Sequence, residues 1–404
     1  MALLSVADAL ARVLAHAAPL PVEQVAIDVA HGRVLAEDLT ALRTQPPGDV
    51  SAMDGYAVRA ADLHTLPARL KVIGEVAAGH PFDEEIGSGE AARIFTGGLL
   101  PPGADMVVIQ EDVAREGDWI IVRQAGGVGK HVRHAGIDFR DGDRLLAKGR
   151  RLSGRDVTLA AAMNRGTLAV HRPPKVALLA TGDELIWPGR EPKRGEIVYS
   201  NGYAIAALAR AEGAETVNLG IAPDRLEEIV AAMRRARALG VDLLVTTGGA
   251  SVGERDLMHR ALAAEGADLS FWKVALRPGR PLMHGRLGEM HVLGLPGNPV
   301  SAFVCSLIFM VPLLRKMSGR GDVQTESESA RLAVPLKAND GREDYLRASL
   351  APASDGGPPL ATPFPSQDSS LMRPLAQANC LIIRPPFAPV AEAGDPCRIL
   401  RLPF

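Results

Sequence analysis

The feature that most constrains the fold of this chain is a regular alternation of strand-like and helix-like segments that begins at Lys175. Residues 201–213 and 225–239 have helical periodicity, and a third helix is expected after Pro299. The intervening apolar runs are typical of strands and occupy 175–185, 215–224, 241–247 and 291–295. Alternation at this spacing predicts a doubly wound, mostly parallel α/β domain with helices on both faces of one sheet.

Each of the four predicted strands is followed by a loop of the kind that binds ligands. In an open α/β sheet such loops gather at the carboxyl ends of the strands, where substrates bind. Their convergence on one edge indicates a site more strongly than any single loop does. The candidate residues in these loops are Glu184, Asp224, Gly248, Gly249, Ser251, Gly253, Asp256, Pro296, Asn298 and Pro299.

The loop after the third strand, within VDLLVTTGGASVGERD (241–256), is the most informative. A tight turn at Gly248 and Gly249 leaves backbone N–H groups beside the positive end of a helix, which suits a phosphate-bearing ligand. Glu254 and Asp256 would hold a divalent cation, Mg²⁺, together with that phosphate. The alternative is an ordinary turn between strand and helix, with two acids that favour a helix N-terminus.

A cationic segment, FWKVALRPGRP (271–281), lies between these loops in the sequence. Lys273, Arg277 and Arg280 surround a Pro-Gly turn. Three cations near clustered acids suggest a clamp for phosphate or another oxyanion, because arginine offers a forked donor and lysine a mobile charge. A solvated surface is the alternative.

Two loops in the amino-terminal part of the chain are further candidates. Asp54 lies in a Pro- and Gly-rich stretch, 44–63, and is either a pocket carboxylate or a turn residue bonded to its own backbone. Thr96 precedes two glycines and either donates its hydroxyl to an oxyanion or caps a turn. Short alternating runs between 68 and 136 predict a small β-domain.

Two clusters that resemble metal sites are assigned to turns and surface. His131 and His134 are three residues apart, but flanking glycines argue against the helix that a metal site would need. Asp138, Asp141 and Asp143 resemble half of a calcium loop, yet its glycine and closing glutamate fall at the wrong positions. Neither cluster predicts a metal by itself.

Composition excludes several classes of protein. The chain has 404 residues, of which 47% are apolar, so it is expected to form hydrophobic cores. Its net charge of −2 predicts no general attraction to nucleic acid or membranes. The apolar run 302–314 is shorter than the ~20 residues that span a bilayer, and the amino terminus is unlike a secretion signal. The three scattered cysteines, expected to be buried, are Cys305, Cys380 and Cys397. A cytoplasmic protein is expected.

The composition also suggests a division into domains. Helical and extended segments in 1–45 and 137–172 are expected to form one discontinuous domain, with 46–136 inserted as a small β-domain. Residues 173–322 form the α/β domain, and short strands between Pro- and Gly-rich turns predict a β-domain over 323–404. Arg342, Arg347, Ser366 and residues 369–373 of that last domain are candidates to face the cleft.

The chain resembles the molybdopterin molybdenumtransferase family, which includes bacterial MoeA and the E domain of gephyrin. The resemblance covers essentially the whole chain. It is carried, in order and spacing, by SAMDGYAVR, IFTGG, TGDEL, SNGYAIAALARAEGA, NLGIAPD, GGASVGERD, WKVALRPGRP and GLPGNPVSAF.

The resemblance implies insertion of molybdate into adenylylated molybdopterin, with Mg²⁺, giving molybdenum cofactor and AMP. It implies a homodimer whose site is completed by the Asp54 and Thr96 loops of the other subunit. Catalytic acids would be Asp54, Asp138, Glu184, Asp224 and Asp256, with the last three as tentative Mg²⁺ ligands. Molybdate would be bound near Ser251, Arg342 and Ser366. Partners would include the molybdopterin adenylyltransferase and proteins that mature molybdoenzymes.

Two departures from the family pattern and two rival functions accompany this reading. Arginine stands at 277 and 280 where family members often carry lysine, and Ile137 stands where glutamate often precedes Asp138.

The rival functions are an adenylyltransferase that activates the pterin with ATP, and a dimeric scaffold without catalysis.

Overall fold

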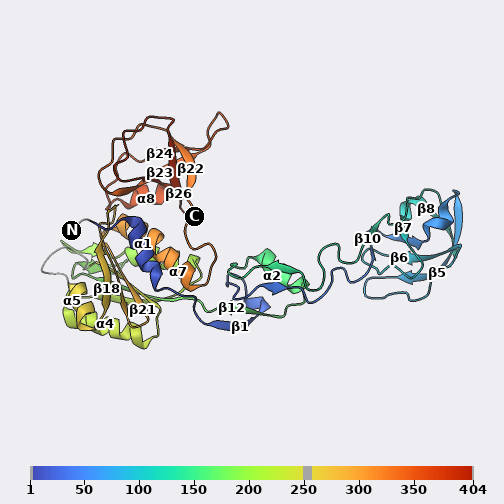
Figure 1. Ribbon diagram of the computed structural model, residues 1–404, viewed down its shortest axis with the longest axis horizontal. Coiled ribbons are helices and arrows are strands. Elements are labelled where there is room, and N and C mark those ends of the chain that lie inside the picture. Colours follow the sequence, from blue (N-terminus) through green and yellow to red (C-terminus); the bar gives the residue numbers. More distant parts are fainter. Residues whose placement is uncertain (1–2, 249–256, 403–404) are drawn as a thin grey trace.

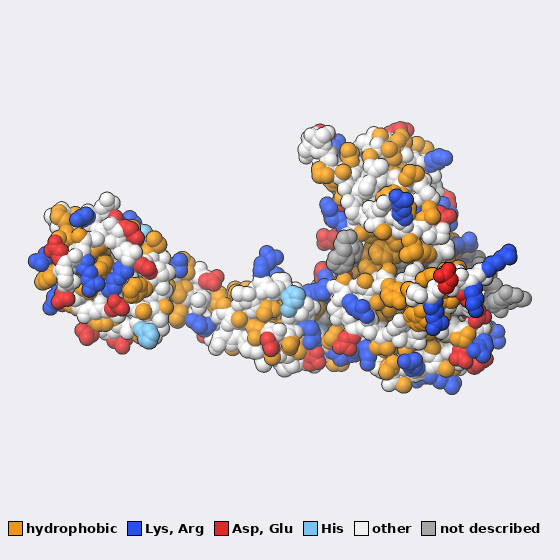
Figure 2. Space-filling model, turned by 180° about the vertical axis from the view of Figure 1, so that it is seen from behind, with side chains coloured by type: hydrophobic (Ala, Val, Ile, Leu, Met, Phe, Trp, Pro, Cys, Tyr) orange, Lys and Arg blue, Asp and Glu red, His pale blue; other side chains and the backbone are white. Residues whose placement is uncertain are grey.

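The computed structural model describes residues 3–248 and 257–402. The molecule is elongated, with an α/β domain and a β-barrel at one end and a small β-domain at the other (Figure 1). The space-filling view shows a narrow region between these ends and an interspersion of positive and negative side chains on the visible face (Figure 2). Both described termini lie at the α/β end (Figure 1).

The α/β domain is built on a six-stranded sheet of order β16-β13-β17-β21-β20-β18. The first three pairings, β13 with β16, β13 with β17 and β17 with β21, are parallel, and the last two are antiparallel. The strands are β13 (Lys175–Thr181), β16 (Glu215–Ala222), β17 (Leu243–Thr247), β18 (Asp268–Lys273), β20 (Pro281–Leu287) and β21 (Met290–Leu295). The predicted doubly wound, mostly parallel sheet is confirmed.

Two hydrophobic cores, one on each face, account for the buried central strands. Strands β17 and β21 are buried along their whole length, as expected of parallel strands covered on both sides. One core includes residues of α1, α3, α6 and α7, and the other includes residues of α4 and α5. The helices are α1 (Val6–Ala15), α3 (Asn201–Ala211), α4 (Leu226–Ala238), α5 (Leu257–Ala264), α6 (Pro299–Cys305) and α7 (Val311–Met317).

Helices α6 and α7 are joined through a π-helical segment, Ser306–Met310, into one apolar helix from Pro299 to Met317. Pro312 lies just after the π segment, where its missing N–H disturbs the regular hydrogen-bond ladder. Among the described residues this is the one helix long and apolar enough to cross a membrane, and 83% of its most apolar stretch is buried. It is a core helix of the α/β domain.

The region between the two ends is formed by segments from both sides of the inserted β-domain. Strand β1 (Val22–Ala26) pairs with β12 (Thr167–His171), and β2 (Leu39–Thr40) pairs with β11 (Arg144–Leu146). Helix α2 (Gly154–Ala162) begins at a capping box in which Ser153 and Asp156 bond reciprocally. This arrangement brings the segments before and after the insertion together.

The far β-domain contains a six-stranded sheet of order β7-β4-β6-β5-β9-β8. Its strands are β4 (Gly55–Val58), β5 (Ala68–Val76), β6 (Glu90–Ile94), β7 (Met106–Ile109), β8 (Val113–Glu116) and β9 (Trp119–Val122). A short pair, β3 (Val50–Ser51) with β10 (Val132–Arg133), lies where the chain enters and leaves. A β-fold in this region was predicted.

The carboxyl-terminal domain is a closed barrel. Its strands run in the order β23-β24-β22-β26-β25, and β25 pairs back with β23, so no edge is left open. They are β22 (Glu328–Leu332), β23 (Glu343–Ala351), β24 (Leu360–Pro363), β25 (Cys380–Arg384) and β26 (Pro396–Arg401). Strand β19 (Leu276–Arg277), from the α/β part of the chain, adds to β23.

Buried histidines make the α/β domain sensitive to acid. His284 on β20 and His291 on β21 are buried and their ring nitrogens lie 3.2 Å apart. Desolvation lowers the pKa of His284 to about 3 and that of His291 to about 4, and the charge of Arg286 adds to both shifts. Both rings are therefore neutral in the native protein at neutral pH.

We expect stability to fall as the pH drops from about 6.5 toward about 4, because the unfolded histidines then bind protons that the native ones do not. The loss is on the order of 2 kcal/mol per histidine at about pH 5. Urea unfolding from pH 7 to 5 measures it, and His284→Leu/His291→Leu should flatten the slope. A variant of the exposed His64, His64→Gln, is the control. Equal slopes in all three proteins would contradict the assignment.

Candidate functional site

A cavity of about 380 Å³ lies at the carboxyl edge of the parallel strands. It is formed by loops that follow β13, β17 and β21, so the convergence predicted from the sequence is confirmed for these three loops. The lining residues are Thr181, Glu184, Leu185, Ile197, Val198, Tyr199, Ser200, Asn201, Thr247, Gly248, Gly297, Asn298, Pro299, Ser370 and Met372.

The floor of the cavity requires glycine at position 248. Gly248 has a φ of +86°, and a Cβ there would overlap the carbonyl oxygen of Thr181. The buried hydroxyl of Thr181 lines the same cavity and has no hydrogen-bond partner within the described part of the chain. Glycine at this position therefore lets the ends of β13 and β17 approach each other closely beside the cavity.

Tyr199 contributes to one wall of the cavity, a position that the sequence did not predict. Tyr199 lines the cavity, stacks edge-on against Trp187 at 5.4 Å between ring centroids, and lies 5.8 Å from the Tyr203 ring. Burial raises the pKa of Tyr199 to about 12, so its hydroxyl stays protonated. Two-residue strands β14 (Leu185–Ile186) and β15 (Ile197–Val198) hold this wall, and segments so short have no periodicity to detect.

The carboxyl-terminal domain closes another side of the cavity. The Asn298 side chain donates to Ser369 Oγ at 2.7 Å, and the backbone N–H of Val300 donates to the Ser369 carbonyl at 3.1 Å. Asn201 on α3 donates to the Gly297 carbonyl at 2.6 Å. The two bonds to Ser369 dock the 366–372 loop on the turn and first residues of α6 and bring Ser370 and Met372 to the cavity, and the Asn201 bond joins α3 to the same turn.

Arg347 stabilises that loop. It is only 1% exposed, and its guanidinium donates to the carbonyls of Leu371 at 2.8 Å, Asp368 at 2.9 Å and Ser366 at 3.2 Å. The expectation that Arg347 faces the cleft is wrong, because backbone acceptors within the barrel domain take up its donors. Ser366 itself is exposed, and its hydroxyl accepts a weak bond from the Asp368 N–H.

Three acids gather beside the cavity. The Asp224 N–H donates to Asp183 at 3.1 Å, and desolvation together with the charges of Asp183 and Glu184 raises the pKa of Asp224. Among the described residues no three His, Cys, Asp or Glu side chains form a metal-binding group. Mg²⁺ commonly uses one or two carboxylates with water and phosphate as remaining ligands, so Glu184 and Asp224 suit it. Their mutual repulsion is what a cation would relieve.

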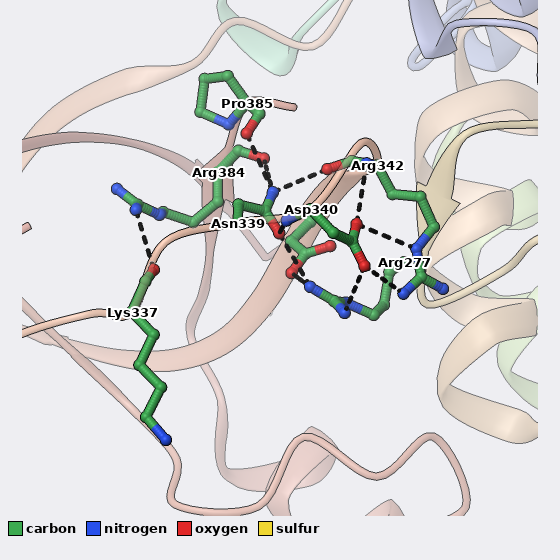
Figure 3. Close-up of polar contacts among 8 residues, drawn as sticks. Arg277, Lys337, Asn339, Asp340, Arg342, Arg384 and Pro385 are labelled. Atoms are coloured by element: carbon green, nitrogen blue, oxygen red, sulfur yellow. Dashed lines mark hydrogen bonds and ion pairs between the residues drawn. The ribbon is translucent and has the colours of Figure 1, made fainter. Parts of the chain in front are cut away.

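The predicted cations lie at the junction with the barrel domain. Arg277 pairs with the buried carboxylate of Asp344 and, at 3.3 Å, with Asp340; Arg342 pairs with Asp340 at 2.6 Å (Figure 3). Lys273 and Arg280 are exposed. Arg277 and Arg342 are thus already paired with carboxylates, and the role of the predicted cations toward a ligand stays a prediction.

Asp54 and Thr96 contact each other in the far β-domain. The backbone N–H and the hydroxyl of Thr96 both donate to Asp54 Oδ1 at 2.8 Å, and these two bonds lower the pKa of Asp54. Asp138 lines a second cavity of about 570 Å³, which Gly97 and Arg133 also line. The two loops predicted in this half of the chain therefore meet, on an exposed surface.

Within one chain, the far β-domain, which carries Asp54 and Thr96, and the α/β domain, which contains Glu184 and the first cavity, lie at opposite ends of the molecule (Figure 1). A single subunit therefore does not unite the two sets of predicted residues. Pro296 is buried, and Asn298 and Pro299 line the first cavity. The predicted residues that lie outside the described part of the chain are Gly249, Ser251, Gly253, Glu254 and Asp256.

Comparison with known sequences covers nearly the whole chain. Residues 4–164 match the profile described as MoeA N-terminal region (domain I and II), 177–316 match a probable molybdopterin binding domain, and 329–402 match MoeA C-terminal region (domain IV). The chain belongs to the molybdopterin molybdenumtransferase family. A protein of that name from Haemophilus influenzae is 34% identical to this chain, and the match covers 90% of each of the two sequences. One from Synechococcus elongatus is also 34% identical, and the match covers 99% of this chain and 100% of that relative.

Solved structures agree with the family assignment. Two crystal structures of a molybdopterin biosynthesis MoeA protein from Pyrococcus horikoshii superpose with TM-scores of 0.84 and 0.83, at 32% and 30% identity. Each superposition covers 99% of this chain. It covers 99% of the first Pyrococcus horikoshii structure and 100% of the second. The family's probable molybdopterin binding domain contains every residue of the first cavity except the two from the barrel domain, Ser370 and Met372.

We expect Gly248→Ala to destabilise this family member and to distort the cavity, because alanine meets both an unfavourable φ and the Thr181 carbonyl. Gly240 also has a positive φ, but a Cβ there would meet open space. Gly240→Ala is thus a matched control for backbone strain alone. Chemical denaturation should show Gly248→Ala less stable than Gly240→Ala by at least about 1 kcal/mol, and equal losses would contradict the overlap.

Proposed function

We propose that the protein inserts molybdate into adenylylated molybdopterin and releases AMP, with Mg²⁺. The observation that carries the proposal is the cavity at the carboxyl edge of the sheet, which lies in the segment matching a probable molybdopterin binding domain. The relatives' name, molybdopterin molybdenumtransferase, supplies the reaction class.

The residues around the cavity suit an anionic, aromatic substrate. Thr181, whose buried hydroxyl has no partner in the described part of the chain, and the turn at Gly248 lie on one side, and the mostly buried Tyr199 ring forms an apolar boundary on another. The N-terminus of α3, at Ser200 and Asn201, adds the positive end of a helix dipole, since the Ser200 side chain caps no N–H group there. We infer that pterin and phosphate bind against these groups.

Glu184 and Asp224 would hold the Mg²⁺, with Asp256 as the tentative third ligand. The ion would supply positive charge to the phosphoanhydride as AMP departs. Desolvation and the nearby charges of Asp183 and Glu184 raise the pKa of Asp224, and a bound cation would offset both effects. Lys273, Arg277, Arg280 and Arg342 are the proposed cationic contacts to phosphate and molybdate.

A homodimer would complete the site. We infer that the Asp54–Thr96 loop of one subunit approaches the cavity of its partner, because one chain keeps these parts at opposite ends (Figure 1). The hydrogen bonds from Thr96 keep Asp54 ionised, as a carboxylate acting on a metal or a proton requires. The proposed location is the cytoplasm, with the adenylyltransferase and molybdoenzyme maturation proteins as partners.

Asp224→Ala tests the catalytic role of the acids. We expect molybdate-dependent AMP release from adenylylated molybdopterin to fall on the order of 100-fold while dimerisation and stability persist. Glu289→Gln changes a fully exposed acid of the same domain and serves as the control. A folded, dimeric Asp224→Ala protein with unchanged AMP release would indicate a scaffold, and consumption of ATP with molybdopterin would indicate an adenylyltransferase.

Mixed dimers test the shared site. Asp54→Ala and Asp224→Ala proteins should each be inactive, but co-expression should restore about a quarter of wild-type AMP release, because half of the dimers are mixed and each has one intact site. Differently tagged subunits allow the mixed dimer to be purified and assayed alone. An inactive mixed dimer would place Asp54 and Asp224 of the same chain in one site, contrary to the proposal.

A further inference from the structure

Asp340 lies between the two arginines that are candidates for oxyanion binding. Its Oδ2 accepts from Arg342 Nη2 at 2.6 Å and from Arg277 Nη1 at 3.3 Å (Figure 3). Its Oδ1 accepts from the Arg342 backbone N–H at 3.0 Å and from Arg342 Nε at 3.2 Å. One carboxylate thus binds two guanidinium groups, the arrangement by which two arginines hold a phosphate-like anion.

Contacts other than this carboxylate also hold the cluster in place. Arg277 is anchored by its second nitrogen, which donates to buried Asp344 and, at 2.9 Å, to Asn339 Oδ1. Asn339 in turn donates to the carbonyls of Arg342, Arg384 and Pro385, so the loop backbone is fixed (Figure 3). The two fixed points leave the exposed Asp340 side chain as the replaceable partner.

The charges of the two arginines and the two aspartates indicate what the Asp340 side chain does. Arg277 and Arg342 carry two positive charges, and Asp340 and Asp344 carry two negative ones when ionised. The two arginines lower the pKa of Asp340 to about 2, so its carboxylate is charged at any physiological pH. A free anion therefore meets a neutral cluster while Asp340 is in place, and a cationic one when Asp340 has turned away.

We propose that Asp340 is a resident anion, and that a tetrahedral dianion, either molybdate or the phosphate of the nucleotide, binds Arg277 and Arg342 by displacing it. Singly charged anions bring no more charge than the carboxylate they would replace, so the exchange selects for dianions. Asp340 is accordingly a specificity-determining residue. The inference rests on the proposed function for the identity of the dianion, and its geometry is independent of that function.

Asp340→Asn in the full chain tests the proposal, because the amide keeps the shape and removes the competing charge. Titration calorimetry with molybdate, inorganic phosphate and AMP should show at least one of these binding about fivefold more tightly than to wild type. Tighter molybdate alone identifies the metal oxyanion, and tighter phosphate or AMP identifies the nucleotide phosphate. Adding Arg342→Gln should abolish the gain.

Asp355→Asn is the matched control, since Asp355 is an exposed aspartate of the same domain that pairs with Arg331 at 2.7 Å. It should leave all three affinities within about twofold of wild type. Asp340→Ala, which removes the acceptor altogether, should reproduce the gain of Asp340→Asn. Unchanged or weaker binding of all three anions to both Asp340 variants would overturn the proposal.

The AMP-release assay separates this inference from the proposed function. Suppose that the wild-type protein turns over with molybdate while Asp340→Asn binds the three anions no more tightly than wild type. That result would overturn only the proposal that Asp340 occupies the anion site. Tighter dianion binding in Asp340→Asn, together with no molybdate-dependent AMP release by wild type, would overturn only the proposed reaction.

Discussion

The parallel pairing of four neighbouring strands is the constraint on which the rest of this structure depends. Strands β16, β13, β17 and β21 are adjacent and run in the same direction, so the loops that follow them leave from one edge of the sheet. Residues as distant in sequence as Thr181 and Pro299 therefore line one cavity. The close approach of Gly248 to Thr181 is a local consequence of that pairing.

The barrel domain completes the site as well as covering it. Its 366–372 loop is held by buried Arg347 and packs against the turn before α6. Ser370 and Met372 of this segment line the cavity. Strand β19 pairs with β23, which brings Arg277 to Asp344. The position of the barrel thus affects residues that line the cavity, and Arg277, which is proposed to bind an anion, also holds the two domains together.

The long separation between the two ends gives the oligomer its proposed role. Asp54 and Thr96 are hydrogen-bonded to each other on an exposed surface of the far β-domain, and this domain lies at the opposite end of the molecule from the α/β domain (Figure 1). The two hydrogen bonds favour the charged form of this carboxylate, so Asp54 presents a negative charge at the end of the molecule opposite the acids. A partner subunit provides the simplest means of bringing it to a substrate.

The sequence by itself determined the strand–helix alternation, the parallel sheet and three of the loops at its edge, because hydrophobic periodicity and glycine turns are local signals. It also determined the family, through motifs spread over the whole chain. Only the tertiary structure decided that Arg347 supports a loop, that Tyr199 forms a wall and that Asp340 lies between two arginines. Those facts depend on contacts between segments that are far apart in sequence. A local sequence pattern does not predict which buried acceptor or charged group a side chain will contact in the folded protein.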